Sequence, residues 1–362
     1  MAGDTGMSFT TTILRLVSVL TMQNDLKEYL ASQIATDSMA ELCRSLNEIG
    51  PYVSDLSFAD PLTMGRLTSY ITVQARRSAY RQFHIPKKSG GVRVITAPDG
   101  ELKDILTTLA FIFSERYVPT PNAMAFTSGR SVADNARAHV GHHYVLNLDL
   151  KDFFTTITAM DVERGLNRIG ISPLVSRDLA TICTYPVSDG QRVRNVLPQG
   201  SPASPVLSNI CSMTLDRRLE GLARRFHLTY TRYADDMTFS SNHNVYHEDG
   251  DFMRELHQII SECGFTVNPS KTRLQKRGAR QEVTGLNVGE RVNVSRHYVK
   301  TLRAIIHHIA INDHPTKHEV CVTKGKLNYL RMVKGKHDST YITLLVKLKQ
   351  AVAGKKLVIS NP

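Results

Sequence analysis

Two adjacent carboxylates at the turn of an apolar hairpin constrain most strongly what this chain can fold into. The segment 228–239 is rich in β-forming residues on both sides of Tyr233-Ala234-Asp235-Asp236, and this pattern predicts strand, turn and strand. Upstream, the apolar run 144–149 predicts another strand, which ends in Asp149. Adjacent aspartates are common in ordinary turns. Burying them in β structure is costly without a compensating metal or partner, so we interpret the three acids as one site.

The expected chemistry of that site is phosphoryl transfer. A pair of divalent cations roughly 3.5–4 Å apart clamps the attacking and leaving oxygens of an in-line displacement. Asp149 and Asp235 are the predicted direct ligands, and the carbonyl of Leu150 adds an oxygen that suits hard Mg²⁺. Asp236 completes the catalytic trio, either as a ligand or as electrostatic support. The sequence therefore predicts a site for two magnesium ions.

The positive charge of the chain is concentrated in its last quarter. The net charge is +12 over 362 residues. From Lys271 to Pro362 there are 19 Lys and Arg against 5 Asp and Glu, whereas the remaining residues are nearly neutral in sum. A basic segment of this size favours a polyanionic partner, and nucleic acid is the leading candidate.

Cysteines and apolar runs indicate the compartment. The five cysteines are scattered, without a CxxC pair or zinc spacing, as is typical of reduced thiols in the cytosol. The apolar run 13–20 is too short to span a membrane and lacks the features of a signal peptide. We therefore expect a cytoplasmic protein with no membrane partner.

Local patterns predict the order of the elements. Helical spacing over residues 11–49 stops at Gly50-Pro51. A hairpin over 78–98 turns at Gly90-Gly91. The remaining expected elements are helices over 101–117, 131–140, 251–263 and 297–312, a helix that follows the breaker 199–205, and short strands up to Val288.

Three motifs in this order resemble the reverse transcriptases. They are Asn-Leu-Asp-Leu-Lys-Asp-Phe-Phe at 147–154, Leu-Pro-Gln-Gly-Ser-Pro-Ala-Ser-Pro at 197–205 and Tyr-Ala-Asp-Asp at 233–236. Two further matches narrow the resemblance to the bacterial retron reverse transcriptases: Asn135-Ala-Arg-Ala-His139 is similar to their NAxxH motif, and Val283-Thr284-Gly285 to their VTG motif. The resemblance extends from about residue 80 to the C-terminus.

This resemblance implies an α+β fold with right-hand polymerase architecture, in which an antiparallel-sheet palm lies between fingers and a helical basic thumb. The expected domains are an N-terminal helical region (1–50), fingers with a retron-type insertion (51–143), a palm with the remaining fingers segments (144–270), and a primer grip with an RNA-binding thumb (271–362). The implied activity is RNA-directed DNA polymerisation on a dedicated structured non-coding RNA. Synthesis would start from an internal guanosine 2′-OH and give branched multicopy single-stranded DNA (msDNA). The family also implies an effector (toxin) protein and a role in anti-phage defence.

The resemblance also implies a site for deoxynucleoside triphosphates. The aromatic ring of Phe154 would lie beneath the incoming sugar and exclude a 2′-OH, and Lys271 would be a general acid for pyrophosphate. Cationic side chains on the fingers hairpin would grip the phosphates. The nucleotide-binding set is Arg93, Lys87, Asp152, Phe153, Phe154 and Gln199.

The expected contacts with nucleic acid lie in the two retron motifs and the basic thumb. Duplex RNA and RNA–DNA hybrid are recognised mostly through backbone shape and charge. The predicted set is Asn135, His139, Val283, Thr284, Gly285, Arg291, Arg296, Lys300 and Arg303. Three tyrosines of the same segment either stack on bases or pack half-buried: Tyr298, Tyr329 and Tyr341.

Two alternatives remain open from the sequence. One is a group II intron-like or diversity-generating reverse transcriptase. The other is a polymerase-like RNA-binding scaffold without turnover, although the presence of all three acids argues against it. The C-terminal segment has too few acids for a ribonuclease H site, and Phe154 disfavours an RNA-dependent RNA polymerase.

Overall fold

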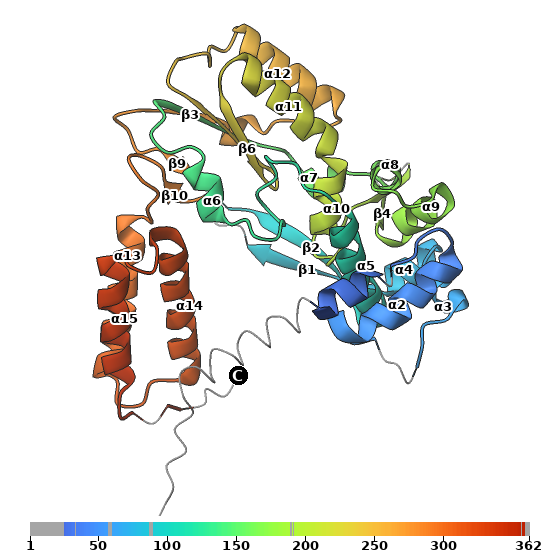
Figure 1. Ribbon diagram of the computed structural model, residues 1–362, viewed down its shortest axis with the longest axis horizontal. Helices are drawn as coiled ribbons and strands as arrows, with labels where there is room; N and C mark the ends of the chain where they lie inside the picture. Colours follow the sequence, from blue (N-terminus) through green and yellow to red (C-terminus); the bar gives the residue numbers. More distant parts are fainter. Residues whose placement is uncertain are drawn as a thin grey trace, which may run out of the picture. The chain divides into compact units, whose positions relative to one another are not determined.

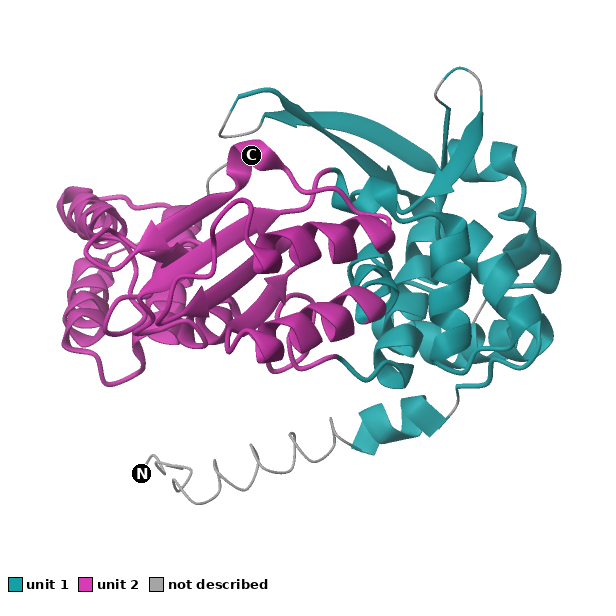
Figure 2. Ribbon diagram, turned by 90° about the horizontal axis from the view of Figure 1, so that it is seen from above, with its two compact units in different colours: residues 1–119, 152–213 teal, residues 120–151, 214–362 magenta. Residues whose placement is uncertain are grey.

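The structure is a computed structural model that describes residues 25–32, 34–56, 60–86, 90–188, 190, 192–355 and 357–358. The apolar run 13–20 and Lys87 lie outside the described residues. The chain forms two compact units, each built from two stretches of sequence (Figure 2). Unit 1 comprises residues 1–119 and 152–213, and unit 2 comprises residues 120–151 and 214–362.

Unit 1 is mainly helical. Its buried residues come largely from α2, α5, α8, α9 and α10, which supply leucine, isoleucine and valine side chains. The helices are α2 (Met39–Val53), α3 (Met64–Ser69), α4 (Val73–Ser78), α5 (Gly100–Arg116), α7 (Phe153–Thr156), α8 (Ala159–Arg168), α9 (Pro173–Ile182) and α10 (Ser204–Cys211).

The expected end of the first described long helix is wrong. α2 continues through Gly50 and Pro51 to Val53, and the Ser54 N–H closes it by donating to the Gly50 carbonyl. A proline so near the C-terminal end costs the helix little beyond one donor. Gly50 is required by packing, because a Cβ atom at this position would meet the side chain of Leu56 at 2.5 Å.

Two hairpins complete unit 1. The predicted hairpin over 78–98 is confirmed as β1 (Tyr80–Pro86) and β2 (Val92–Pro98), antiparallel partners in one two-stranded sheet. The second hairpin pairs β4 (Tyr185–Ser188) with β5 (Val193–Val196).

Unit 2 is built around a four-stranded antiparallel sheet with the strand order β6-β7-β3-β8. The predicted strand 144–149 is confirmed as β3 (Tyr144–Asp149), and the predicted hairpin as β6 (Thr229–Tyr233) and β7 (Asp236–Ser241). The edge strand β8 spans Arg273–Lys276. β3 and β7 are therefore interior strands, each hydrogen-bonded on both sides.

Aromatic side chains join this sheet to the helices of unit 2. Tyr230 stacks on Phe239 with ring centroids 4.7 Å apart, and Phe239 contacts Phe252 edge-on at 5.4 Å. Phe252 belongs to α12, which Figure 1 shows beside α11. The helices are α6 (Val132–Arg137), α11 (Met213–Arg225) and α12 (Asp251–Glu262). α6 ends earlier than the predicted 131–140.

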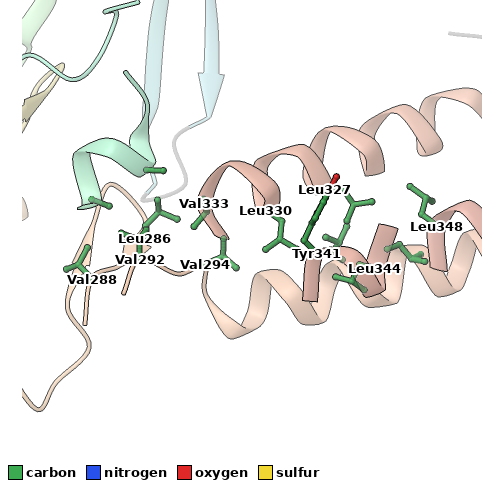
Figure 3. Close-up of a cluster of buried hydrophobic side chains, with 14 of the residues drawn as sticks. Leu286, Val288, Val292, Val294, Leu327, Leu330, Val333, Tyr341, Leu344 and Leu348 are labelled. Atoms are coloured by element: carbon green, nitrogen blue, oxygen red, sulfur yellow. The ribbon is translucent and has the colours of Figure 1, made fainter. Parts of the chain in front are cut away.

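The basic C-terminal segment forms a bundle of three helices, α13 (Arg296–Ile311), α14 (Lys317–Lys334) and α15 (Ser339–Val352) (Figure 1). Before it come η1 (Pro269–Lys271), β9 (Glu282–Val283) and β10 (Leu286–Asn287). Figure 3 shows that apolar side chains continue from the segment containing Leu286 and Val294 into the bundle, where they meet Leu327, Leu330 and Leu344. Tyr341 is buried in this core, so of the two roles considered for it, stacking on bases or packing, the structure supports packing.

Within the described residues, no helix has the length and apolar character needed to cross a membrane. All five cysteines are free thiols.

Candidate active site

Three acids meet at one end of the sheet of unit 2. Asp149, the last residue of β3, is paired directly with Asp236, the first residue of β7. Opposed residues of antiparallel strands have Cβ atoms roughly 4.5–5.5 Å apart. Asp235 precedes Asp236 in the turn, and its carbonyl accepts a hydrogen bond of 3.0 Å from the Leu150 N–H. The backbone therefore brings the three predicted acids together.

Asp149 and Asp236 line a pocket of about 550 Å³ that lies within unit 2. Side chains of β3, the Tyr233–Asp236 turn, η1 and the Thr284-Gly285 turn contribute to it. The lining residues are Val132, Asn147, Leu148, Asp149, Tyr233, Asp236, Thr238, Ser270, Lys271, Thr272, Arg273, Thr284 and Gly285.

A short loop holds Asp149 from the side opposite β7. Lys271 Nζ donates to Asp149 Oδ2 at 2.7 Å, and Asn268 Nδ2 donates to Oδ1 at 3.2 Å. The Asn268 N–H also donates to the Asp149 carbonyl at 2.8 Å. The hydrogen bond to Asp149 is the main cause that raises the pKa of Lys271. Sequence reasoning missed Asn268, although the turn-forming Asn-Pro pair before Lys271 was a usable signal.

Negative charge accumulates at Asp236. Burial in the pocket, followed by the charges of Asp235 and Asp149, raises the pKa of Asp236 to about 6. Its side chain nevertheless keeps solvent contact through the pocket mouth. A cation bound here would relieve the repulsion that raises this pKa.

The donor chemistry fits a hard divalent cation. In the described part of the chain, no group of three or more His, Cys, Asp or Glu side chains is already arranged to hold a metal ion. The three acids nevertheless supply only oxygen donors, as Mg²⁺ prefers, and burial, followed by the charges of Asp235 and Asp149, raises the pKa of Asp236. Of the three, Asp149 is now neutralised by the ammonium group of Lys271.

A buried ion pair supports the turn that carries the acids. Arg232 Nε and Nη2 donate to the two carboxylate oxygens of Asp216, each at 2.7 Å, and both side chains are fully buried. Arg232 Nη1 donates to the Ala234 carbonyl at 3.1 Å. Ala234 has a left-handed φ of 59°, so this bond fixes a strained residue between Tyr233 and Asp235. This ion pair could not be predicted from the sequence, because Asp216 lies in an amphipathic helix, where a charged residue is expected to face solvent.

The two retron motifs are joined by a buried hydrogen-bond chain. Asn135 Nδ2 donates to Thr284 Oγ1 at 3.3 Å, and Thr231 Oγ1 donates to Asn135 Oδ1 at 2.6 Å. His139 lies 2.7 Å from both Thr231 Oγ1 and Ser240 Oγ. Because the Thr231 hydroxyl proton goes to Asn135, His139 Nε2 is the donor to Thr231. This series of hydrogen bonds ends at Thr284, a β-branched residue with a left-handed φ of 46°.

Three of the expected contacts with nucleic acid do not agree with this arrangement. Asn135, His139 and Val283 are buried, so their side chains present no surface to nucleic acid. Burial lowers the pKa of His139 to about 3, and the imidazole is therefore neutral. Of the two motifs, Thr284 and Gly285 are the residues that line the pocket.

The expected nucleotide-binding residues that the structure describes lie in unit 1. Asp152 has a left-handed φ of 49° and precedes α7, while Phe153 is buried and contacts the half-exposed Phe154 edge-on. Arg93 is exposed on β2. The Gln199 carbonyl accepts from the Thr96 N–H of the same strand at 2.8 Å.

The glycine after Gln199 is required by a close approach to β2. Gly200 has a φ of 131°, and a Cβ atom there would lie 2.8 Å from the Ile95 side chain and 3.0 Å from the Thr96 carbonyl. The Gln-Gly-Ser-Pro turn is therefore held against the hairpin that carries Arg93.

The expected basic residues are exposed in unit 2. Arg296, Lys300 and Arg303 follow one another at helical spacing along α13. Arg291 lines a separate pocket of about 410 Å³ with Arg137, Lys334 and Asp338.

Known proteins similar to this chain support one family. Residues 85–329 match the model of the family described as "Reverse transcriptase (RNA-dependent DNA polymerase)". The retron Mx65 reverse transcriptase of Myxococcus xanthus is 36% identical over 298 residues, which cover 77% of this chain and 67% of that protein. The retron Ec86 reverse transcriptase of Escherichia coli is 33% identical over 275 residues, which cover 75% of this chain and 82% of that protein.

A solved structure of telomerase from Candida albicans, in complex with a TWJ fragment of telomeric RNA, aligns with a TM-score of 0.42. The alignment has 12% identity and covers 75% of this chain and 59% of that one.

Proposed function

This chain belongs to the retron reverse transcriptases and is an RNA-directed DNA polymerase, and from that membership we propose that it copies a dedicated structured non-coding RNA into branched msDNA. Synthesis starts from an internal guanosine 2′-OH of that RNA. The observation that carries this proposal is the direct pairing of Asp149 with Asp236 beside Asp235. With the neighbouring Asp235, this pairing brings three carboxylates together, which supports a site for nucleotidyl transfer.

Asp149 and Asp235 are the proposed ligands of two Mg²⁺ ions, with Asp236 in support. When bound there, the two ions would make the priming hydroxyl a better nucleophile and would offset the negative charge of the pyrophosphate leaving group. The protein's own residues orient this chemistry: Asn268 fixes one oxygen of Asp149, and Arg232 fixes the turn before Asp235. Lys271 is the proposed general acid for pyrophosphate, and its ammonium group lies beside the acids, 2.7 Å from Asp149 Oδ2.

Nucleotide selection is assigned to residues of unit 1. Phe154 excludes the 2′-OH of ribonucleotides, while Asp152 and Phe153 present backbone N–H groups to the triphosphate. Arg93 and Lys87 bind its phosphates, and Gln199 lines the nucleotide pocket. The fit of Gly200 against β2 supports this set, because it holds the Gln199 turn on the hairpin that carries Arg93.

The basic bundle is proposed to bind the RNA and its DNA product through their backbones. Arg296, Lys300 and Arg303 form an exposed cationic row on α13, and Arg291 precedes it. The expected division into N-terminal region, fingers, palm and thumb is kept as part of this proposal. The family further suggests a bacterial cytoplasmic location, an effector (toxin) protein as partner and anti-phage defence.

The test is a primer-extension assay with a structured RNA, deoxynucleotides and Mg²⁺. Asp235→Ala and Asp149→Asn should each lower product formation by at least about a thousandfold, because each removes a carboxylate that stabilises the transition state. Asp251→Asn is the matched control, since this exposed acid pairs with Arg254 on the surface of the same unit. Equal product from the wild type and both site variants would refute the assignment.

A further inference from the structure

Two tyrosines left open by the sequence come together in a small pocket of unit 2. Tyr298 of α13 and Tyr329 of α14 have ring centroids 5.4 Å apart and planes inclined by 50°. With Gly285, Leu286, Val294 and Ser295 they line a cavity of about 220 Å³, which we call the tyrosine pocket. Ligand pockets for drug-sized molecules are usually about 300–1,000 Å³. The tyrosine pocket therefore suits one planar ring system.

The polar groups around the tyrosine pocket are largely satisfied within the protein. The Tyr298 hydroxyl donates to the Lys326 carbonyl at 2.8 Å, which fixes the position of its ring. The Ser295 hydroxyl accepts from the Tyr298 N–H at 3.1 Å as the cap of α13. The lining includes the two aromatic rings and the apolar residues Leu286 and Val294. Such a surface recognises a ligand by stacking, as proteins do with unpaired bases.

The tyrosine pocket adjoins the carboxylate pocket. Gly285 lines both cavities. Burial, followed by the charge of Tyr233, raises the pKa of Tyr329. Tyr233 lines the carboxylate pocket and directly precedes the Ala234-Asp235-Asp236 turn. A nucleotide that reaches the acids from this side therefore passes Gly285 and has an aromatic surface next to it.

We propose that the tyrosine pocket holds the base of the ribonucleotide whose 2′-OH starts DNA synthesis. This inference rests on the proposed function. A nucleotide that primes through its 2′-OH still continues the RNA through its 3′-phosphate, so it must turn away from the regular helical path to present that hydroxyl. Its base then loses stacking partners, and a protein surface replaces them. An ordinary DNA primer end keeps its last base paired and stacked, and has no such need.

The experiment compares two reactions of the same enzyme preparation. One is synthesis on the structured RNA, measured as a covalent RNA–DNA product. The other is extension of a DNA primer annealed to an RNA template, measured at its 3′-OH. Tyr329→Ala should lower the ratio of the first rate to the second by at least about tenfold, the scale of losing one stacked base. Tyr329→Phe keeps the ring and should leave the ratio within about twofold of the wild type.

The outcomes separate this inference from the proposed function. If Tyr329→Ala slows both reactions in parallel, or changes neither, the ratio of the two rates stays the same. The proposed role of the tyrosine pocket is then wrong, while 2′-OH priming is unaffected. If the wild-type enzyme extends the DNA primer but yields no covalent RNA–DNA product, the role of the tyrosine pocket and 2′-OH priming are both wrong. If Tyr329→Ala does not fold, Tyr329→Leu retains apolar volume without a flat face, and the same ratio decides the matter.

Discussion

Removing one partner of the buried Arg232–Asp216 pair should destabilise unit 2 far more than removing any surface pair. In the variant Arg232→Met, the Asp216 carboxylate stays buried and keeps only the hydroxyls of Tyr230 and Thr120 as donors, at 3.0 and 2.8 Å. Breaking a buried ion pair in this way costs about 3–5 kcal/mol. Whole domains are stable by only about 5–15 kcal/mol, so the loss is a large fraction of the total.

The assay is urea unfolding followed by circular dichroism, because the chain has no tryptophan to report by fluorescence. Arg254→Met is the matched control, since it breaks the exposed pair with Asp251 and should cost about 0–1 kcal/mol. The double variant Arg232→Met/Asp216→Leu removes both charges and should be less destabilised than the sum of the two single variants, by about 2 kcal/mol or more.

The same substitution should loosen the turn that carries the acids. Arg232→Met removes the donor to the Ala234 carbonyl, and amide hydrogen exchange over 229–241 should accelerate more than over α12. The reasoning is refuted if Arg232→Met lowers the free energy of unfolding no more than Arg254→Met does.

Three further predictions follow from the described contacts. The pKa of His139 is lowered from 6.5 to about 3 by burial, so the folded state excludes a proton that the unfolded state binds below pH 6.5. Its contribution to stability is complete above pH 6.5 and is lost as the pH falls toward 3, at up to about 1.4 kcal/mol per pH unit; urea unfolding at pH 7 and 5 should show a smaller pH effect in His139→Gln. Phe154→Ala should relax discrimination against ribonucleotides in incorporation assays. Unchanged discrimination would show that Phe154 does not exclude the 2′-OH. Gly200→Ala should lower the melting temperature and nucleotide incorporation, because its Cβ would lie 2.8 Å from the Ile95 side chain; a variant as stable and active as the wild type would contradict this.

The sequence was sufficient where local pattern decides structure. The strand that ends at Asp149 and the hairpin around Asp235 were predicted because alternation and turn residues are local signals. The antiparallel register places Asp149 opposite Asp236, and it accompanies the burial of β3 and β7 in one sheet.

The sequence was insufficient where distant polar groups satisfy one another. Asn135 and His139 look like surface residues by type, yet they are buried because Thr231, Ser240 and Thr284 provide hydrogen-bond partners from 92 to 149 residues away. No single window of sequence contains such partners.

The interior position of β3 has a consequence for heat inactivation. Asp149 lies at the end of a strand that is hydrogen-bonded to neighbours on both sides, and its own carbonyl accepts from Asn268. Thermal fraying begins at edges and exposed ends, where the fewest bonds must open together. On gentle warming, the edge strand β8 should therefore open before the pairing of Asp149 with Asp236 is lost, and the site should re-form on cooling.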